Sequence, residues 1–475
     1  MMRLKTVLTA AAFAVACPLF AQAQGSTANL IRLNAAALND AGEPVTDLKI
    51  SDFQISDQGK SQKIAFFRPI PAAVPASPGE ASNRTAPPPH STVILFDLLN
   101  ITQSDRLDIW HRIGRSLQQL DGGDSVYFYL LTLEGNLEPI HAFGGKAGDD
   151  HTWTQHVEQT LDKAMTAASH ARPTQMNDEE LVVKKTYVAL ETLANQLTAL
   201  TGRRDIIWIT SGMPQAWNKR IQCNGDWVDC ALYVNHMAVT LAFDNVSVNP
   251  VTYTSNPNPD VTRDLEQMGL LTGGTTYVAD DIRSVLKQVD RDAANSYSII
   301  YALPPEAFDS KFHKIRVTVN RKGVKLHVRQ RYFAFPDKTP EATKQHALLA
   351  GAFQSTVDDP AIGLRASIAA GAAGKPARLQ IRVDPADLML HENGGHFEDT
   401  LSILVSDVGA GGPIGEPALT SSNVNLSREE RESAAKNGIP ISMEHPLGDL
   451  VQKVRVIVLD QASAVVGSVT VPVTK

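Results

Sequence analysis

The stretch STVILFDLLNIT, Ser91 to Thr102, decides the fold of this chain. Its apolar run, Val93 to Phe96, ends abruptly in a carboxylate, Asp97, and a helix-like stretch begins near Ser104. In open α/β sheets, ligand sites lie just outside the carboxyl ends of the strands. The stretch therefore predicts a buried strand that carries an acidic side chain to such an edge.

Strands and helices alternate along the chain beyond this point. Apolar runs typical of buried strands alternate with amphipathic segments that suit one helical face. A tight turn near Gly135 predicts one antiparallel strand, over 137–143. We expect further strands at 125–133, 206–211, 246–253, 275–278 and 297–303, and helices at 105–120, 153–167, 180–200, 231–243, 261–271 and 282–293. This alternation indicates a doubly wound, mostly parallel α/β sheet that is covered on both faces.

The regions on either side of the α/β segment have a different composition. Short alternating strands separated by turn residues precede it, followed by a segment rich in Pro, Ala and Ser. A hairpin around Lys322-Gly323 extends the central domain, and the C-terminal part again has β-like alternation of immunoglobulin size. The predicted division is a signal peptide (1–23), an N-terminal β unit (24–68), a linker (69–90), the α/β domain (91–335), a second linker (336–347) and a β-sandwich-like domain (348–475).

Composition excludes some classes of protein. The chain has 475 residues, 43% hydrophobic and 20% charged, with a formal net charge of -7. These values are those of an ordinary globular protein. A net negative charge without a basic, aromatic-rich patch gives no reason to expect a nucleic-acid partner.

The N-terminus has the features of an export signal. Arg3 and Lys5 precede an apolar run, Val7 to Phe20, and Ala21-Gln22-Ala23 fits a small-x-small cleavage pattern. A membrane anchor is the alternative, but the run falls short of the roughly 20 residues that a span needs. We therefore expect a secreted protein, periplasmic or extracellular. Cys17 lies in AVAC, a partial lipobox, so a lipoprotein is a second alternative.

Two cysteines remain once the signal is removed. Cys223 and Cys230 flank the turn-rich stretch NGDWVD. In an exported chain such a pair predicts a disulfide. Two free thiols are the alternative, and a zinc site is a third, although only His236 lies near.

Several phrases of the chain, in order, resemble the von Willebrand factor type A (VWFA) domain proteins of the acidobacterial type. They are DAGEPVTDLKISDFQISDQGKSQKIAFF, ILFDLLNIT, GRRDIIWITSGMP, LTGGTTYVADDIRSVLKQVDRDAANSYSIIY and HKIRVTVNRKGVKLHVRQRYFAF. The resemblance covers roughly Leu30 to Phe335. It implies a Rossmann-like domain with a cell adhesion-like, protein-binding role, while fold alone does not fix function.

The resemblance also implies a metal-ion-dependent adhesion site, here in degenerate form. Such sites use an Asp-x-Ser-x-Ser motif at the first strand, a loop Thr and a second Asp, which supply hard oxygens to Mg²⁺. Asp97 is present, but Leu99 and Ile101 replace the serines, and Ser211 stands near the position of the second Asp. Thr174 is the candidate for the loop Thr. We expect no cofactor.

Two interpretations of Asp97 remain open. Mg²⁺ or Ca²⁺ would bind through Asp97, Asn100, Thr102 and waters in a rearranged site. Alternatively, Asp97 caps the following helix or hydrogen-bonds a facing loop.

The loop after Ile209 carries two tryptophans, Trp217 and Trp227. Exposed aromatic side chains on a tied-down loop are typical of recognition surfaces, while packing on the base of the loop is the alternative. We therefore expect an exported, non-enzymatic interaction module that binds a protein or cell-envelope polymer at the rim of the sheet. The predicted binding residues are Asp97, Asn100, Thr102, Ser211, Trp217 and Trp227.

Catalysis has little support in the sequence. There is no Gly-x-Ser-x-Gly around Ser211, no His-Glu-x-x-His and no obvious acid pair. A hydrolase with an unrecognised site is the third hypothesis, after metal-dependent binding at Asp97.

Overall fold

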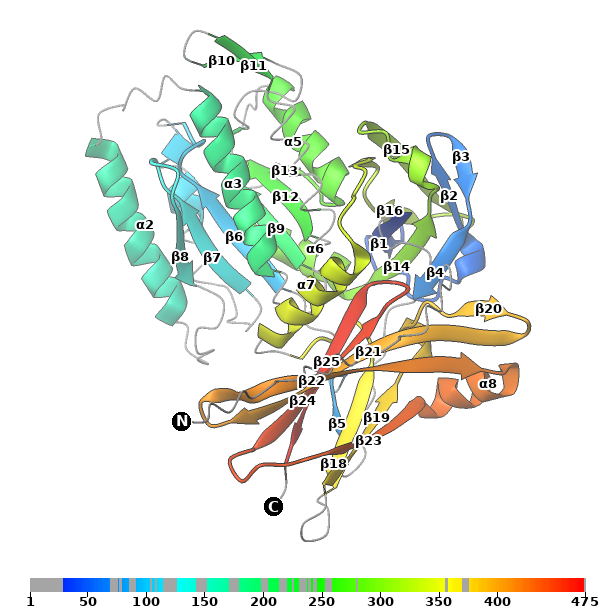
Figure 1. The fold of residues 1–475 in the computed structure, drawn as a ribbon. Helices are drawn as coiled ribbons and strands as arrows, with labels where there is room; N and C mark the ends of the chain where they lie inside the picture. The colour runs from blue at the N-terminus through cyan, green and yellow to red at the C-terminus, as the bar shows by residue number, and fades with distance from the viewer. Residues whose placement is uncertain are drawn as a thin grey trace, which may run out of the picture.

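The computed structural model describes most of the chain. It covers residues 29–68, 76, 79–84, 91–102, 105–106, 109–113, 126–141, 152–170, 179–197, 204–212, 220–223, 226–229, 237, 241, 246–252, 259–278, 281–354, 358–369 and 376–473. The predicted signal peptide and Cys17 lie outside these residues. Figure 1 shows an α/β body and two β bodies packed against one another.

A six-stranded sheet forms the α/β body. Its order is β13-β12-β9-β6-β7-β8, and every neighbouring pair is parallel except β7 with β8. The strands are β6 (Ser91–Asp97), β7 (Val126–Leu131), β8 (Leu137–His141), β9 (Arg204–Ile209), β12 (Val246–Thr252) and β13 (Tyr277–Val278). This confirms the predicted mixed α/β class with a mostly parallel sheet, including its antiparallel edge strand.

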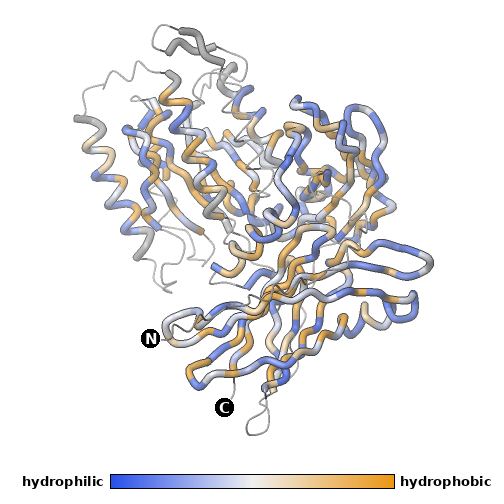
Figure 2. Tube along the Cα trace, viewed as in Figure 1, coloured by the Kyte–Doolittle hydropathy of each residue, from blue (hydrophilic) through white to orange (hydrophobic). Residues whose placement is uncertain are grey.

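Helices cover both faces of this sheet. They are α2 (Thr152–His170), α3 (Glu179–Leu197), α5 (Pro259–Thr272) and α6 (Ile282–Ala294). The core under α3 and α5 contains Val93 and Leu95 of β6, whereas Ile94 and Phe96 belong to the core under α2 and α6. Because both faces are buried, β6 is apolar without alternation. Figure 2 shows apolar residues, in orange, on the strands of this body and on the helices that cover them.

The N-terminal strands pair with strands that follow α6. Two four-stranded antiparallel sheets, ordered β16-β1-β14-β4 and β17-β15-β2-β3, enclose a common apolar core. Their strands are β1 (Leu30–Leu38), β2 (Phe53–Asp57), β3 (Lys60–Gln62), β4 (Ile64–Arg68), β14 (Ser296–Ala302), β15 (Phe312–Val319), β16 (Lys325–His327) and β17 (Arg331–Phe333), with short 3-10 turns at Ile50–Asp52 and Pro305–Ala307.

The strand β14 follows a helix, and this position would put it in the parallel sheet. Instead, β14 lies outside that sheet. Its residues pair antiparallel with β1, from Leu30 opposite Ala302 to Ala36 opposite Ser296. Tyr297, Ile299 and Tyr301 enter the core shared with β1 and β2. A strand after a helix reads as a parallel crossover, and the sequence alone does not show that β1 is the partner.

The C-terminal body consists of two antiparallel sheets around one core. One sheet is ordered β23-β19-β18-β5, and the other β20-β21-β24-β25 with β22 added to β21. The strands are β5 (Ala81–Ser82), β18 (Leu364–Ala369), β19 (Ala377–Val383), β20 (His391–Asn393), β21 (His396–Gly409), β22 (Gly412–Leu426), β23 (Ile439–His445), β24 (Lys453–Asp460) and β25 (Val465–Pro472), with a 3-10 turn at Pro385–Asp387 and the helix α8 (Arg428–Asn437).

Both predicted linkers contain regular structure in part. The strand β5, within 69–90, pairs with β18 at Arg365 and Ala366. The helix α7 (Glu341–Gln354) begins inside 336–347, and its Leu349 packs against Ile457 of β24. Within the described part of the chain, no helix combines the length and apolar character needed to cross a membrane.

Candidate functional site

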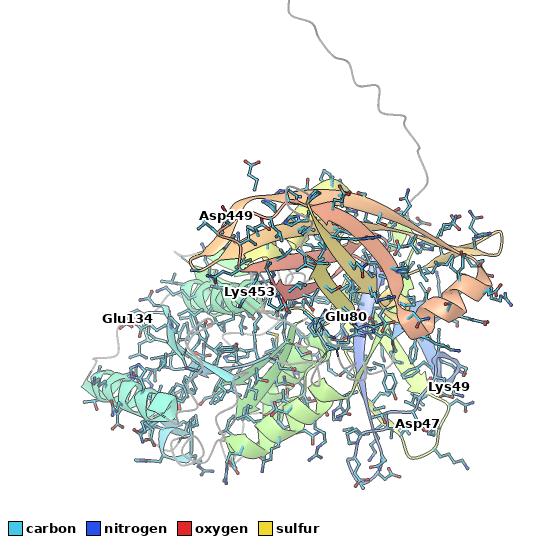
Figure 3. All side chains as sticks on the ribbon, turned by 90° about the horizontal axis from the view of Figure 1, so that it is seen from below. Asp47, Lys49, Glu80, Glu134, Asp449 and Lys453 are labelled. Carbon is cyan, nitrogen blue, oxygen red and sulfur yellow. The ribbon has the colours of Figure 1, made fainter. Side chains whose placement is uncertain are left out.

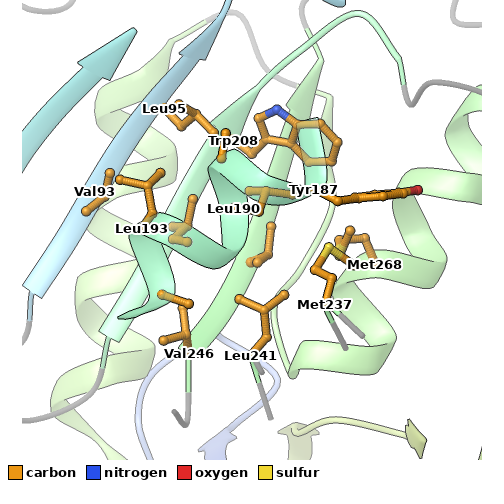
Figure 4. Packing of buried hydrophobic residues seen from close by; sticks show 14 of the residues in the cluster. Val93, Leu95, Tyr187, Leu190, Leu193, Trp208, Met237, Leu241, Val246 and Met268 are labelled. Atoms are coloured by element: carbon orange, nitrogen blue, oxygen red, sulfur yellow. The ribbon is translucent and has the colours of Figure 1, made fainter. Parts of the chain in front are cut away.

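The carboxyl end of β6 places Asp97 beside the neighbouring strand β9. The parallel register puts Leu95 opposite Trp208, and Asp97 lies two residues further along on the same face of the sheet. Figure 4 shows Leu95 and Trp208 side by side above the core of this face. The indole of Trp208 therefore lies within reach of the Asp97 side chain.

Three N–H groups donate to the Asp97 carboxylate. The backbone N–H of Asn100 donates to Oδ1 at 3.0 Å, and its Nδ2 donates to Oδ2 at 2.7 Å. The indole Nε1 of Trp208 donates to Oδ2 at 2.9 Å. Asp97 is 0% exposed, so protein groups replace water around both oxygens. These donors come from the turn after β6 and from the neighbouring strand β9.

Burial and hydrogen bonding act on Asp97 in opposite directions. Burial disfavours the charged form and raises the pKa of Asp97 to about 6, against the lowering effect of the donors from Asn100 and Trp208 and of Thr210. The desolvation effect is the larger. The proton equilibrium of this carboxyl group therefore falls near neutral pH.

Asn100 links the strand end to the helix α3. Its Nδ2 also contacts Thr186 Oγ1 at 2.9 Å, and the Thr186 hydroxyl donates to the backbone oxygen of Val182 at 2.9 Å. Thr186 is 0% exposed. The turn after β6 is thus fixed to the helix that covers this face of the sheet.

Leu99 and Ile101, which stand at the serine positions of the metal-site motif that the sequence resembles, are part of the apolar packing. Ile101 is 1% exposed and lies in the core under α2 and α6. Leu99 is partly buried and packs against the core under α3 and α5. The residues after Asp97 therefore attach the turn to both cores.

A second polar group lies on the same rim, around Asp105. The Thr102 hydroxyl donates to Asp105 Oδ2 at 2.7 Å, and the Ser211 hydroxyl donates to the same oxygen at 3.2 Å. Two predicted site residues, Thr102 and Ser211, are thus brought together by an acid that the sequence analysis did not single out. Among the described residues, no three His, Cys, Asp or Glu side chains group closely enough to suggest a metal site.

The loop after β9 is described in part. Its backbone forms a hairpin of β10 (Arg220–Cys223) and β11 (Asp226–Asp229), in which Cys223 pairs with Asp226 and Gln222 with Trp227. Figure 1 places this hairpin at the end of the α/β body near the start of α5. Trp217, Cys230, Thr174 and the side chains of Cys223 and Trp227 lie outside the description, so the disulfide and the role of the tryptophans stay predictions.

Three polar partners of this rim escaped the sequence analysis: Trp208, Thr186 and Asp105. Trp208 had a usable signal, since a Trp within a buried strand usually finds an acceptor for its N–H. The strand IIWITS and the acid Asp97 end at the same edge of the sheet. Thr186 and Asp105 had no comparable signal, because single hydroxyls and acids on helices are common on protein surfaces.

Comparison with protein families and with curated proteins finds no match for this chain. Among solved structures, the manganese-loaded TRAP protein of Plasmodium vivax is similar at 11% identity and a TM-score of 0.29, covering 53% of this chain and 95% of that one. The human COPII-coat protein Sec24c is similar at 10% identity and a TM-score of 0.25, covering 58% of this chain and 48% of that one.

Proposed function

We propose that this chain is an exported, non-enzymatic interaction module of the von Willebrand A type. It binds a protein or a cell-envelope polymer through the rim formed by the carboxyl ends of β6 and β9 and by the hairpin β10–β11. Binding does not depend on a bridging cation. One observation carries the proposal: the Asp97 carboxylate is fully buried and engaged by Asn100 and Trp208.

A cation at Asp97 would have to displace these donors. Mg²⁺ and Ca²⁺ bind several hard oxygens, and a bridging site also keeps a position open for the partner. Here both carboxylate oxygens already accept N–H groups, and Leu99 and Ile101 offer apolar packing in place of hydroxyls. Rim loops and their aromatic side chains are then the means of recognition that we propose, with Trp217 and Trp227 as anchors.

A binding experiment with a chelator tests this proposal. The protein without its predicted signal peptide is incubated with envelope fractions under two conditions. One contains EDTA, and the other contains Mg²⁺ in excess over EDTA. We expect one retained partner, recovered equally in both conditions and lost at least about tenfold in Trp227→Ala, as for an aromatic hot spot. Leu419→Ala is the control, since Leu419 is 60% exposed on the distant strand β22. Partner retention that requires the divalent cation would overturn the proposal.

A second candidate, metal-dependent binding, rests on the group around Asp105. One carboxylate and the hydroxyls of Thr102 and Ser211 supply three hard oxygens at the rim. Calorimetry with Mg²⁺, Mn²⁺ and Ca²⁺ distinguishes it from the first. Saturable heat that is lost in Asp105→Asn supports it, and no heat at millimolar metal removes it.

A further inference from the structure

We infer that the C-terminal β body contains a binding pocket for a phosphate group. The pocket, of about 90 Å³, lies between the linker strand β5, the strands β18 and β19, and the end of the helix α8. It is independent of the rim described above. Its polar lining comes from Arg84, Arg365, Arg382, Lys436, Ser82 and Asp384.

Two arginines converge at the mouth of this pocket. Arg365 and Arg382 lie directly opposite each other on β18 and β19, so both side chains are on one face of the sheet. Each donates to the backbone oxygen of Asn437 at the end of α8, at 2.9 and 3.2 Å. A guanidinium group has five N–H donors, so most of them stay available after this single bond. Like charges placed opposite each other are unfavourable unless an anion lies between them.

The carboxylate near this pair satisfies it poorly. Glu80 lies 3.9 Å from Arg365 Nη1 and 3.8 Å from Arg382 Nε, whereas charge-assisted hydrogen bonds are about 2.7–2.9 Å long. The buried oxygen Glu80 Oε2 has no hydrogen-bond partner. Glu80, labelled in Figure 3, belongs to the segment that leads into β5. It therefore neutralises part of the charge without occupying the arginine donors.

The surrounding residues hold the arginines in place and leave the pocket open. Arg84 forms the wall: it pairs with Asp384 at 3.2 Å and Asp387 at 2.7 Å, so its charge is compensated. Gly438 has a φ of +76°, and a Cβ there would come within 3.0 Å of the Arg382 side chain. Only glycine both ends α8 in this conformation and leaves room for Arg382.

The charge of the pocket matches a phosphate group. Arg365 and Arg382 share one nearby carboxylate, Glu80, and Lys436, which also lines the pocket, has no ion pair among the residues that the structure describes. About two positive charges stay unbalanced, and a phosphate monoester carries about -1.5 to -2 at pH 7. A ligand with a single carboxylate would leave one positive charge of the pocket unbalanced. Free phosphate and a phosphate monoester share this chemistry.

Calorimetry on the full chain at constant ionic strength tests the pocket. The titrants are inorganic phosphate, methyl phosphate and acetate, and we expect saturable heat with phosphate and little with acetate. Tighter binding of methyl phosphate than of phosphate indicates a monoester as the ligand, and the reverse indicates the free ion. Arg382→Gln should weaken binding at least about tenfold, the loss of one charge-assisted contact. Glu80→Gln should tighten it several-fold, because the competing carboxylate is removed.

Arg378→Gln is the matched control for these variants. Arg378 is an exposed arginine on the same strand, hydrogen-bonded to Ser442 Oγ at 3.1 Å and outside the pocket lining. It should leave phosphate binding unchanged. Absence of saturable heat with the wild-type chain, or equal weakening by Arg378→Gln and Arg382→Gln, would overturn the inference. The Glu80→Gln variant tests the pocket even if an arginine variant fails to fold. Weaker phosphate binding by folded Glu80→Gln would also count against the pocket.

Discussion

The carboxyl group of Asp97 is buried, so its pKa depends on the folded structure around it. Burial raises the pKa of Asp97 to about 6, although Asn100 and Trp208 donate to its oxygens. Because the pKa of Asp97 in the folded chain is higher than the ordinary aspartate value of 3.8, folding favours the protonated acid. The stabilising contribution is fully present below about pH 4 and is lost as the pH rises through about 6.

Replacing Asp97 by Asn should remove this pH dependence. Because the pKa of Asp97 rises from 3.8 to about 6, the unfolding free energy linked to its protonation changes by about 2–3 kcal/mol between pH 4 and pH 7.5. We expect the difference in stability between the wild type and Asp97→Asn to change by that order over this range, with the wild type relatively more stable at acid pH. Urea unfolding at several pH values measures it. Asp205→Asn, a buried acid on β9 that accepts from Asn249, is the comparison variant. Parallel pH curves for wild type and Asp97→Asn would contradict the assignment.

At the residue scale, the sequence predicted where Asp97 lies but not what it does there. An acid that ends an apolar run marks a strand end whatever its partners are. The donors come from Asn100, three residues on, and from Trp208, which is 111 residues away in the chain. Only the strand order brings Trp208 next to β6, and the register fixes which face it shares.

At the scale of elements, apolar periodicity predicted the strands and helices of the α/β body but not every partnership. The strand β14 has the same apolar character as β9, yet it pairs with β1 and β4 in an antiparallel sheet. Hydrophobic pattern reports burial, and both environments bury a strand. Similarly, Pro and Ala residues around β5 suggested a linker, because two paired residues leave almost no signal of a strand.

The helix α7 gives a prediction at this scale. Its Leu349 is 5% exposed and packs with Leu404, Ile457 and Leu459 on the second C-terminal sheet. Leu349→Ala should lower the free energy of unfolding by about 2–5 kcal/mol, through lost burial and the cavity that remains. Leu348 is a partly buried neighbour on the same helix, and Leu348→Ala should lower the free energy of unfolding by clearly less. Thermal and urea unfolding of both variants check this, and equal effects would show that α7 does not dock through Leu349.

At the scale of the whole molecule, the chain connects its three bodies because segments distant in sequence contribute strands to the same sheet. It forms β1 to β4, contributes β5 to the C-terminal body, builds the α/β sheet and then comes back as β14 to β17. Side chains join the bodies as well: Arg32 of β1 donates to the backbone oxygen of Ser463, and Phe66, Ile300 and Met389 form a small shared cluster. Composition predicted separate segments along the sequence, since local pattern carries no information about pairings hundreds of residues apart.

Fragments of the chain test this organisation. The segment 91–335, the predicted α/β domain, retains β14 but lacks β1 and β4, which flank it on both sides. Tyr297, Ile299 and Tyr301 would then lose the partners of their core, and burial of each such side chain contributes about 1.5–3 kcal/mol. An unpaired apolar strand edge also invites association with other chains. We expect 91–335 to aggregate, and 29–335, which restores both flanking strands, to be monomeric on size exclusion and to melt cooperatively by circular dichroism. A monomeric 91–335 that melts at the temperature of 29–335 would show that the α/β body is stable without the N-terminal strands, and that the boundary predicted from composition also separates independent folding units.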